Sequence, residues 1–235
     1  ISVKKIMNNY AHKYNQTQIQ SLDKTPMLKS ILLFAVISAA VFYLYMGFHT
    51  QINIEETTLP SRIILYKEYI GDYREMNKAM KVLEGELKDL ETTQFRQFGM
   101  FYDDPNLLQD SKQARAIIGV MLDSRDRHIA SKFLINHNHY RINEYNDQTC
   151  LRTVFPYRNE LSLAWVISKV YPALVEYGKS KKVFKKDNTI GSLEIYNFKN
   201  GESNIEVIFP YGDNIQDLML TRAPKPAYLA KNQDL

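Results

Sequence analysis

One uninterrupted apolar run limits what this chain can fold into more than any other feature. Residues 31–48 read ILLFAVISAAVFYLYMGF, contain no charged side chain and would span about 27 Å as an α-helix. Lys29 precedes the run, and Tyr43 and Tyr45 lie near its other end, which is typical of a helix whose ends meet the membrane interfaces. We therefore predict one transmembrane helix over residues 31–48. The alternatives are a buried helix of a soluble protein and a retained signal peptide, and the long preceding segment disfavours the latter.

The net charge of the chain comes from the segment before this run. The 235 residues include 30 basic and 26 acidic ones, and residues 1–30 contain five lysines but only Asp23 as an acid. The rest of the chain is therefore neutral in sum, which disfavours a nucleic-acid-binding domain. Residues 49–61 offer Glu55 and Glu56 and no basic residue. The positive-inside rule then places the amino terminus in the cytosol or matrix and the domain across the membrane.

Few residues suggest catalytic or metal chemistry. Cys150 is the only cysteine, so neither an intrachain disulfide nor a cysteine-based zinc site can form, and we expect a buried thiol. His137 and His139 lie two residues apart without an evident third metal ligand. Asp103 and Asp104 precede a proline, so turn formation explains them best. The sequence has no phosphate-binding loop or nucleophile elbow. We therefore predict no enzyme activity, no cofactor and no metal.

The rest of the chain has the pattern of an α/β (α+β) domain. A helix with one apolar face begins at Met76 and continues to Leu90. Predicted strands lie at residues 62–69, 98–102, 114–122, 140–145, 149–155, 192–198 and 204–209. The strand at 140–145 is expected to pair with the next one, and Asn200-Gly201 is a hairpin signal between the last two. The order strand, helix, strand, strand occurs twice, which predicts two related β-α-β-β units.

These elements divide the chain into five parts. They are a basic amino-terminal arm (1–30), the transmembrane helix (31–48), a linker (49–60), the folded domain (61–220) and a carboxy-terminal tail (221–235). The arm contains the sequon Asn15-Gln16-Thr17, which is used only in a secretory lumen. The first residue is Ile1 rather than methionine, so either a longer presequence was removed or the given sequence begins inside a longer chain, and a removed presequence would favour an organelle.

The second predicted helix is interrupted by a proline. Residues 155–177 read FPYRNELSLAWVISKVYPALVEY, with Leu161 and Trp165 at helical spacing and Pro172 inside the pattern. Proline lacks the backbone donor and clashes with the preceding turn. We therefore expect the helix to kink or restart near Val170, with Pro172 in the first turn of the second piece.

This stretch, together with several shorter motifs, resembles the membrane-anchored GyrI-like proteins, a testis-expressed family that includes an autophagy receptor of the endoplasmic reticulum. The motifs are Tyr66-Lys67, Phe101-Tyr102-Asp103 and Leu193-Glu194-Ile195-Tyr196, and the match covers residues 62 to 210 in order. The resemblance implies a two-layer fold whose halves form a central cleft. In bacterial relatives that cleft receives amphipathic or cationic small molecules.

Four residues are candidates for such a cleft. On the strand at 192–198, Glu194 and Tyr196 face away from Leu193, and a carboxylate beside an aromatic ring suits a cation. Tyr73 and Trp165 lie in stretches that match the family and complete the set. The alternative is that Glu194 is an ordinary hydrogen-bonded glutamate of a strand.

Three functional hypotheses follow. The first is a non-enzymatic, single-pass membrane-anchored protein-interaction module, an accessory subunit of a mitochondrial inner-membrane complex. Its arm would lie in the matrix, its domain between the membranes, and its partners would be membrane lipid and other subunits. The second is an adaptor of the endoplasmic reticulum that resembles the autophagy receptor. The third is binding of an amphipathic cation in the cleft.

Overall fold

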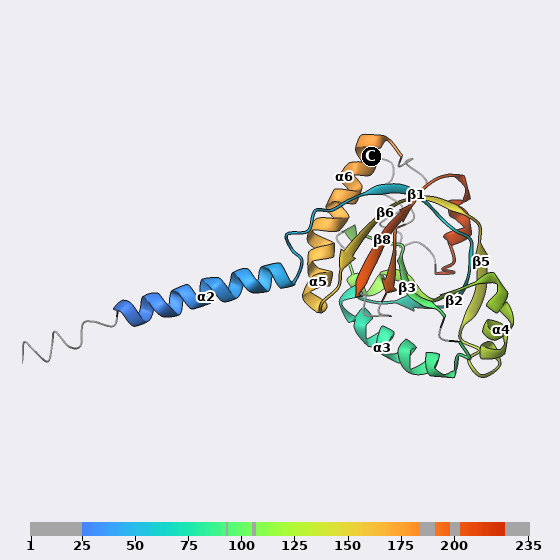
Figure 1. The fold of residues 1–235 in the computed structure, drawn as a ribbon. Coiled ribbons are helices and arrows are strands. Elements are labelled where there is room, and N and C mark those ends of the chain that lie inside the picture. The colour runs from blue at the N-terminus through green and yellow to red at the C-terminus, as the bar shows by residue number, and fades with distance from the viewer. Residues whose placement is uncertain (1–24, 93, 105–106, 184–190, 198–202, 224–235) are drawn as a thin grey trace, which may run out of the picture. The chain divides into compact units, whose positions relative to one another are not determined.

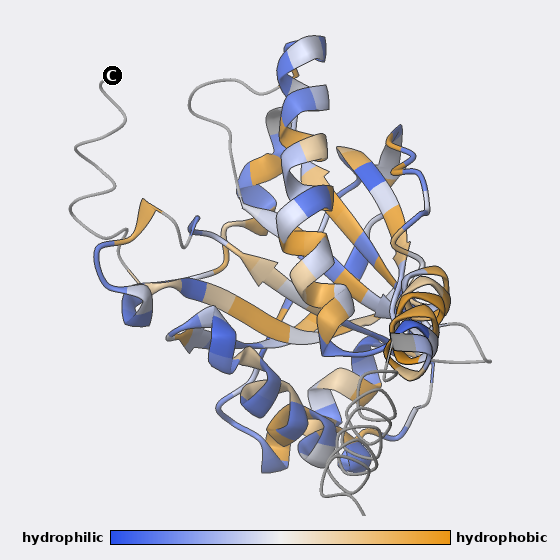
Figure 2. Cartoon of the chain, turned by 90° about the vertical axis from the view of Figure 1, so that its left-hand side faces the viewer, coloured by the Kyte–Doolittle hydropathy of each residue, from blue (hydrophilic) through white to orange (hydrophobic). Residues whose placement is uncertain are grey.

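The computed structural model describes residues 25–92, 94–104, 107–183, 191–197 and 203–223, and the chain divides into two compact units, 1–49 and 50–235. In the first unit, helix α2 (Thr25–Tyr45) has no polar face: its large apolar side chains are 44–73% exposed. Figure 2 shows the hydrophobic colour all around this helix. Residues 26–45 are long and apolar enough to cross a membrane. The predicted arm lies almost entirely outside the described residues.

A glycine cap ends α2. Gly47 adopts a left-handed backbone with φ of 72°. Its N–H donates to the carbonyl of Leu44 (3.1 Å), and the N–H of Phe48 donates to that of Tyr43 (3.4 Å). These two bonds form a Schellman motif, in which the left-handed residue favours glycine. The rings of Tyr43 and Phe48 pack edge to face at 5.9 Å. The predicted span 31–48 therefore ends in the cap rather than in the helix.

The second unit is built on one antiparallel sheet of eight strands, curled on itself (Figure 1). In spatial order these are β1 (Glu55–Leu59), β6 (Gln148–Pro156), β8 (Asn204–Pro210), β7 (Ser192–Asn197), β3 (Arg96–Phe101), β4 (Arg115–Leu122), β2 (Arg62–Ile70) and β5 (Arg141–Tyr145). The α-helices are α3 (Met76–Glu86), α4 (Arg127–Asn136), α5 (Glu160–Trp165) and α6 (Tyr171–Lys181). The 3-10 turns are η1 (Tyr73–Glu75), η2 (Leu87–Asp89), η4 (Ser111–Gln113), η5 (Ser124–Asp126) and η7 (Asp213–Leu218). The predicted α/β fold class is confirmed.

The strand order makes the two predicted β-α-β-β units equivalent. The first lies in the order β2, β4, β3 and the second in the order β6, β8, β7, and they meet where β3 pairs with β7. The hairpin signal Asn200-Gly201 lies outside the described residues, but the strands that it was predicted to join, β7 and β8, do pair.

Two outer strands differ from the sequence prediction. β1 lies within the predicted linker 49–60 and pairs with β6. β5 was predicted to pair with β6, which was wrong: it pairs with β2. Side-chain alternation shows that a segment is a strand, but it does not identify the neighbour that satisfies its backbone groups. Helix α4 is a further element that the sequence pattern left unassigned.

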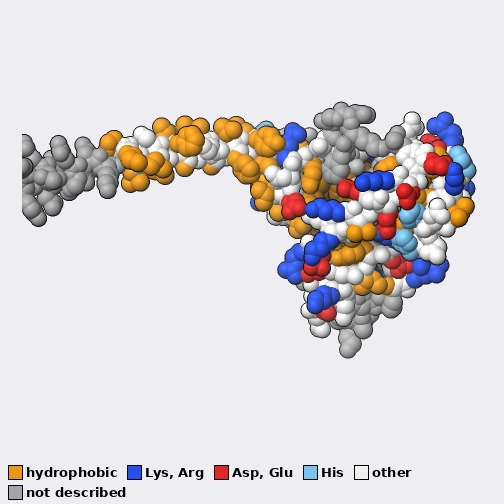
Figure 3. Space-filling model, turned by 90° about the horizontal axis from the view of Figure 1, so that it is seen from below, with side chains coloured by type: hydrophobic (Ala, Val, Ile, Leu, Met, Phe, Trp, Pro, Cys, Tyr) orange, Lys and Arg blue, Asp and Glu red, His pale blue; other side chains and the backbone are white. Residues whose placement is uncertain are grey.

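Alternate residues of the strands build two cores, one on each face of the sheet. The first core includes Phe98, Ile117, Leu193 and Ile195 of the strands and Ile215 and Leu218 of η7. The second includes Leu65, Ile118 and Val120 of the strands, Leu83 of α3 and Phe133 of α4. On the face of the molecule in Figure 3, basic and acidic side chains are interspersed.

Helices α5 and α6 are joined by a π-helical turn, Val166–Val170. The residues that this continuous segment buries recur at every fourth position: Ser162, Val166, Val170, Leu174 and Gly178. In an α-helix with 3.6 residues per turn, every fourth residue drifts around the axis. A π-turn has more residues per turn, so it cancels part of that drift and keeps the buried stripe on the sheet.

The proline explains where the π-turn ends. Pro172 lies in the first turn of α6, where its missing N–H is tolerated, so its predicted position is confirmed. The helix does not break near Val170, however, but continues there through the π-turn. The apolar face predicted for the first piece was wrong, because Leu161 is 52% exposed and the neighbouring Ser162 is buried. A helical period of 3.6 cannot anticipate a stripe with a period of four.

Candidate functional site

Glu194 lies on β7, where the two units of the sheet meet, and the residue is only 6% exposed. Its cross-strand partner on β3 is Gly99, which in turn pairs with Ile118 of the second core. Since cross-strand partners share a face, Glu194 points to the face that the helices cover. Leu193 and Ile195 lie in the first core, on the opposite face, as the alternation predicted.

Two phenol groups hold the carboxylate of Glu194. Tyr171, the first residue of α6, donates to Oε1, and Tyr196 donates to Oε2 at 2.6 Å. The hydroxyl of Ser192 lies 2.7 Å from that of Tyr171. Because a phenol has one proton and that of Tyr171 goes to the carboxylate, Ser192 is the donor in this contact. Both carboxylate oxygens therefore accept a hydrogen bond from a tyrosine.

Gly99 leaves space for this arrangement. A Cβ atom at Gly99 would lie 3.5 Å from Oη of Tyr196 and 3.1 Å from Cζ of Phe101. The missing side chain lets both aromatic groups come close in front of Glu194. A glycine within a strand often marks such a close approach.

Burial dominates the titration of these groups. Burial raises the pKa of Glu194, and the hydrogen bonds from Tyr171 and Tyr196 act in the opposite direction without cancelling it. The pKa of each tyrosine is raised well above its ordinary value by burial and by the adjacent Glu194. Both phenols therefore keep their protons at physiological pH and remain donors.

Glu194 differs from the other buried carboxylates of the domain. Asp103 lies against Arg115 (2.7 Å), and Glu206 lies against Arg152 (2.8 Å). Among the described residues, Glu194 has no lysine, arginine or histidine as a hydrogen-bond or ion-pair partner. Buried charges in proteins are normally paired with an opposite charge. In its ionised form, Glu194 would therefore have no counter-charge among the described residues.

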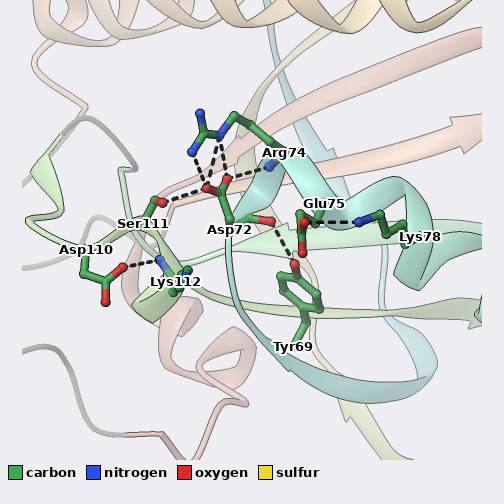
Figure 4. A network of polar contacts seen from close by, with 8 residues as sticks. All are labelled: Tyr69, Asp72, Arg74, Glu75, Lys78, Asp110, Ser111 and Lys112. Atoms are coloured by element: carbon green, nitrogen blue, oxygen red, sulfur yellow. Dashed lines mark hydrogen bonds and ion pairs between the residues drawn. The ribbon is translucent and has the colours of Figure 1, made fainter.

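Tyr73, the third predicted cleft residue, lies at the edge of this group. Its hydroxyl donates to the carbonyl of Arg115 (2.5 Å), and its ring packs edge to face on Phe101 at 4.9 Å. Figure 4 shows how the preceding residue fixes η1: Asp72 accepts hydrogen bonds from Arg74 and Ser111. Tyr73 therefore contributes a ring to the site while its hydroxyl is used by the backbone.

Trp165, the fourth candidate, lies at the end of α5. Its ring lies under the ammonium group of Lys169, which is 5.9 Å from the ring centroid. Glu194 is not among the described contacts of Trp165. The structure thus places Tyr171 and Tyr196 against Glu194, whereas no described contact joins Trp165 to this group. The sequence analysis did not select Tyr171 as a site residue, because helical spacing alone gives no reason to choose it. The adjacent Pro172 marks a change in helix geometry at this point and was the one available signal.

The two histidines form hydrogen bonds with carboxylates. His137 lies 3.0 Å from Asp89, and His139 lies 3.2 Å from Glu86. No group of three or more potential metal ligands occurs in the part of the chain that the structure describes. A cavity of about 70 Å³ lies beside His137 and Phe133, and Glu194 does not line it.

Two other sequence interpretations can now be judged. Asp103 was assigned to turn formation, which was wrong: its carboxylate is fully buried and accepts hydrogen bonds from the side chain and the backbone N–H of Arg115. Turn propensity could not show this because Arg115 lies in the next strand. Cys150 is buried as expected, and burial raises the pKa of its thiol to about 11.

No protein-family model and no curated protein matches this chain. Among solved structures, it is similar to the EcmrR C-terminal domain, with 14% identity, 70% of this chain and 99% of that chain covered, and a TM-score of 0.50. It is also similar to SAV2435 bound to tetraphenylphosphonium (10% identity, 69% and 94% covered, TM-score 0.45). A third is a putative bacterial transcription regulation protein from Staphylococcus aureus MU50 (8% identity, 69% and 100% covered, TM-score 0.45). The domain has the GyrI-like fold.

Proposed function

We propose that this protein binds an amphipathic cation at Glu194. The observation that supports the proposal is the buried carboxylate of Glu194, which has tyrosines but no basic side chain as partners among the described residues. Asp103 and Glu206, which are equally buried, each have an arginine. A cationic ligand would supply the missing counter-charge.

The surroundings of Glu194 favour a cation with an apolar body. The phenol rings of Tyr171 and Tyr196 and the ring pair of Tyr73 and Phe101 lie around the carboxylate or next to it. Aromatic rings attract a cation through their negative faces and bury apolar groups around it. A small, strongly hydrated ion would instead lose its water without adequate replacement.

The test is a thermal shift with tetraphenylphosphonium, which has a permanent charge inside an apolar body. The full chain in mild detergent is expected to melt at a higher temperature with this probe, because a ligand that binds only the folded state stabilises it. Glu194→Gln keeps the shape but removes the charge, and it is expected to weaken binding by about tenfold or more. Glu176→Gln, the same change at an exposed position of α6, should leave the shift unchanged.

A second measurement on the same carboxylate uses pH. The pKa of Glu194 is raised above its ordinary value of 4.5, so it takes up a proton at a higher pH than an exposed glutamate. The affinity for the probe should therefore fall as the pH decreases through that raised pKa. The ligand-free protein should become relatively more stable over the same pH range, because protonation of Glu194 removes the cost of a buried charge. A thermal shift that is independent of pH and unchanged in Glu194→Gln would refute the proposal.

We also propose that α2 anchors the domain to a membrane. The supporting observation is that the large apolar side chains of this 20-residue span are exposed along its whole length, which is costly in water and favourable in a bilayer. The finer hypothesis is an accessory subunit of a mitochondrial inner-membrane complex, and its alternative is an adaptor of the endoplasmic reticulum.

Protease protection of a tag at each end separates these two locations. For the mitochondrial hypothesis, the carboxy-terminal tag should be digested once the outer membrane is opened, and the amino-terminal tag only after the inner membrane is opened. A carboxy-terminal tag that is digested on intact reticulum membranes would instead reject the mitochondrial hypothesis. A protein released from membranes by alkaline carbonate would reject the anchor itself.

A further inference from the structure

We propose that the outward face of α5 and the π-turn docks on the surface of the membrane that α2 spans, so that the domain lies against the bilayer in one orientation. This docking rests on the proposed anchoring by α2 and adds the part of the domain that meets the lipid. The observation behind it is a group of exposed apolar side chains on this helical segment, close to the point where the chain enters the domain.

The segment from Glu160 to Val170 has apolar side chains on its outer side as well as on the side that covers the sheet. Leu161, Ala164 and Ile167 recur at every third residue and are all exposed, Ile167 by 62%. Since successive residues of a helix are turned by about 100°, these three side chains lie on one face, opposite the buried stripe. Clustered apolar side chains on a surface are typical of a site where a protein or a membrane binds.

Trp165 and Lys169 flank this face with side chains that the interface of a bilayer favours. The ammonium group of Lys169 lies 5.9 Å from the ring centroid of Trp165, and the indole is only partly buried. Tryptophan prefers the level of the headgroups, and lysine keeps its stem on apolar surface while its ammonium group reaches water or phosphate. Residues 157–182 contain five basic and two acidic side chains, 5 − 2 = +3, which adds attraction to anionic headgroups.

The chain enters the domain beside this helical segment. β1 and β6 are antiparallel, with Glu55 opposite Arg152, so the residues before Glu55 run toward the end of β6, after which α5 begins. At the end of α6, Nζ of Lys181 lies 3.9 Å from Oε1 of Glu56, at the start of β1. The helices α5 and α6 therefore lie along the edge of the sheet at which the chain arrives.

The chain that reaches this edge is short. Phe48 closes the cap of α2 and Glu55 begins β1, and the residues between them, 49–54, span about 25 Å at most when fully extended. A compact domain of this size is about 40 Å across, so an inserted α2 keeps the domain within less than its own diameter of the bilayer surface. Of the faces that can turn toward the lipid, the one beside the tether with exposed apolar side chains is stabilised most by contact with it.

The experiment uses the fluorescence of Trp165, which is the only tryptophan of the chain and therefore reports on this face alone. The full chain is reconstituted in vesicles of zwitterionic and anionic lipids that carry bromine in the upper part of their acyl chains, where it quenches tryptophan on contact. The fluorescence of Trp165 is expected to lose most of its intensity relative to vesicles of the same lipids without bromine. Iodide added to the water should quench it little.

The double variant Leu161→Gln/Ile167→Gln removes the two large apolar side chains of the face and keeps good helix-forming residues. It should reduce the ratio of docked to undocked domain by about tenfold or more, so that quenching by bromine falls and quenching by iodide rises. Ile135→Gln is the matched control. Ile135 is 79% exposed on α4, which packs at β5, the other outer strand of the sheet, and this variant should be quenched like the unchanged protein.

Extraction with alkaline carbonate separates the docking from the anchor on which it rests. If the chain stays in the membrane but bromine does not quench Trp165, the docking is overturned and the anchor stands. If Trp165 is instead shielded from iodide only when many chains share a vesicle, a second copy covers this face, which also overturns the docking. Equal quenching by bromine in the unchanged protein and the double variant overturns it as well. If carbonate releases the chain, the anchor and the docking fail together.

Discussion

Replacing Gly119 with alanine is expected to destabilise the folded domain by about 3 kcal/mol or more. Gly119 is in the middle of β4, where every residue is buried, and it pairs with Tyr66 of β2. A Cβ atom at this position would lie 2.0 Å from the carbonyl oxygen of Leu65 and 2.7 Å from Cα of Tyr66. Both are backbone atoms, so the overlap can be relieved only by separating β2 from β4. Urea unfolding followed by the fluorescence of Trp165, the only tryptophan, measures the effect.

Gly85→Ala provides a control with the opposite sign. Gly85 is in α3, and a Cβ atom there would have no neighbour within 4 Å. Alanine favours a helix over glycine by roughly 0.5–1 kcal/mol, so this variant should unfold at a higher urea concentration. If Gly119→Ala unfolded at the same concentration as the unchanged protein, the close approach of β2 and β4 would be wrong.

The contrast between these two glycines shows what the sequence can and cannot predict. Hydrophobic alternation identified the six strands of the two β-α-β-β units to within two residues, because each of them buries at least one face. Nothing in the pattern around Gly119 indicates that its backbone approaches Leu65. Such contacts depend on how the sheet curls, which follows from the packing of segments that are far apart in the sequence.

The same limit applies to the candidate site. Strand alternation placed Glu194 and Tyr196 on one face, since two residues of one strand are related by a fixed geometry. Tyr171 comes from another element, and its place beside Glu194 depends on the π-turn and on the register of α6 over the sheet. Gly99 likewise matters only through its cross-strand position. Local rules therefore predict the strand's own contribution, whereas the partners from other elements require the folded structure.

Replacing Asp103 with alanine is expected to destabilise the domain by about 3–5 kcal/mol, because it leaves the charge of Arg115 buried without a partner. The side chains of the pair are 0% and 6% exposed. Asp103 accepts hydrogen bonds from Nε (2.9 Å) and Nη2 (2.7 Å) of Arg115 and from its backbone N–H (2.9 Å). The remaining Nη1 donates to the carbonyl of Ala223 at 3.1 Å. Among the ion pairs of the described residues, this one has the least exposed side chains, so breaking it should cost the most.

The double variant Asp103→Ala/Arg115→Met tests whether the charge is the cause. Removing both charges should recover much of the stability lost in Asp103→Ala, and the remaining deficit should reflect the unpaired backbone N–H of Arg115. Lys78→Ala is the control for an exposed ion pair. The side chains of Lys78 and its partner Glu75 are 79% and 63% exposed, so this variant should change the free energy of unfolding by less than about 0.5 kcal/mol. If the double variant were as unstable as the sum of the two single variants, Asp103 and Arg115 would not be coupled.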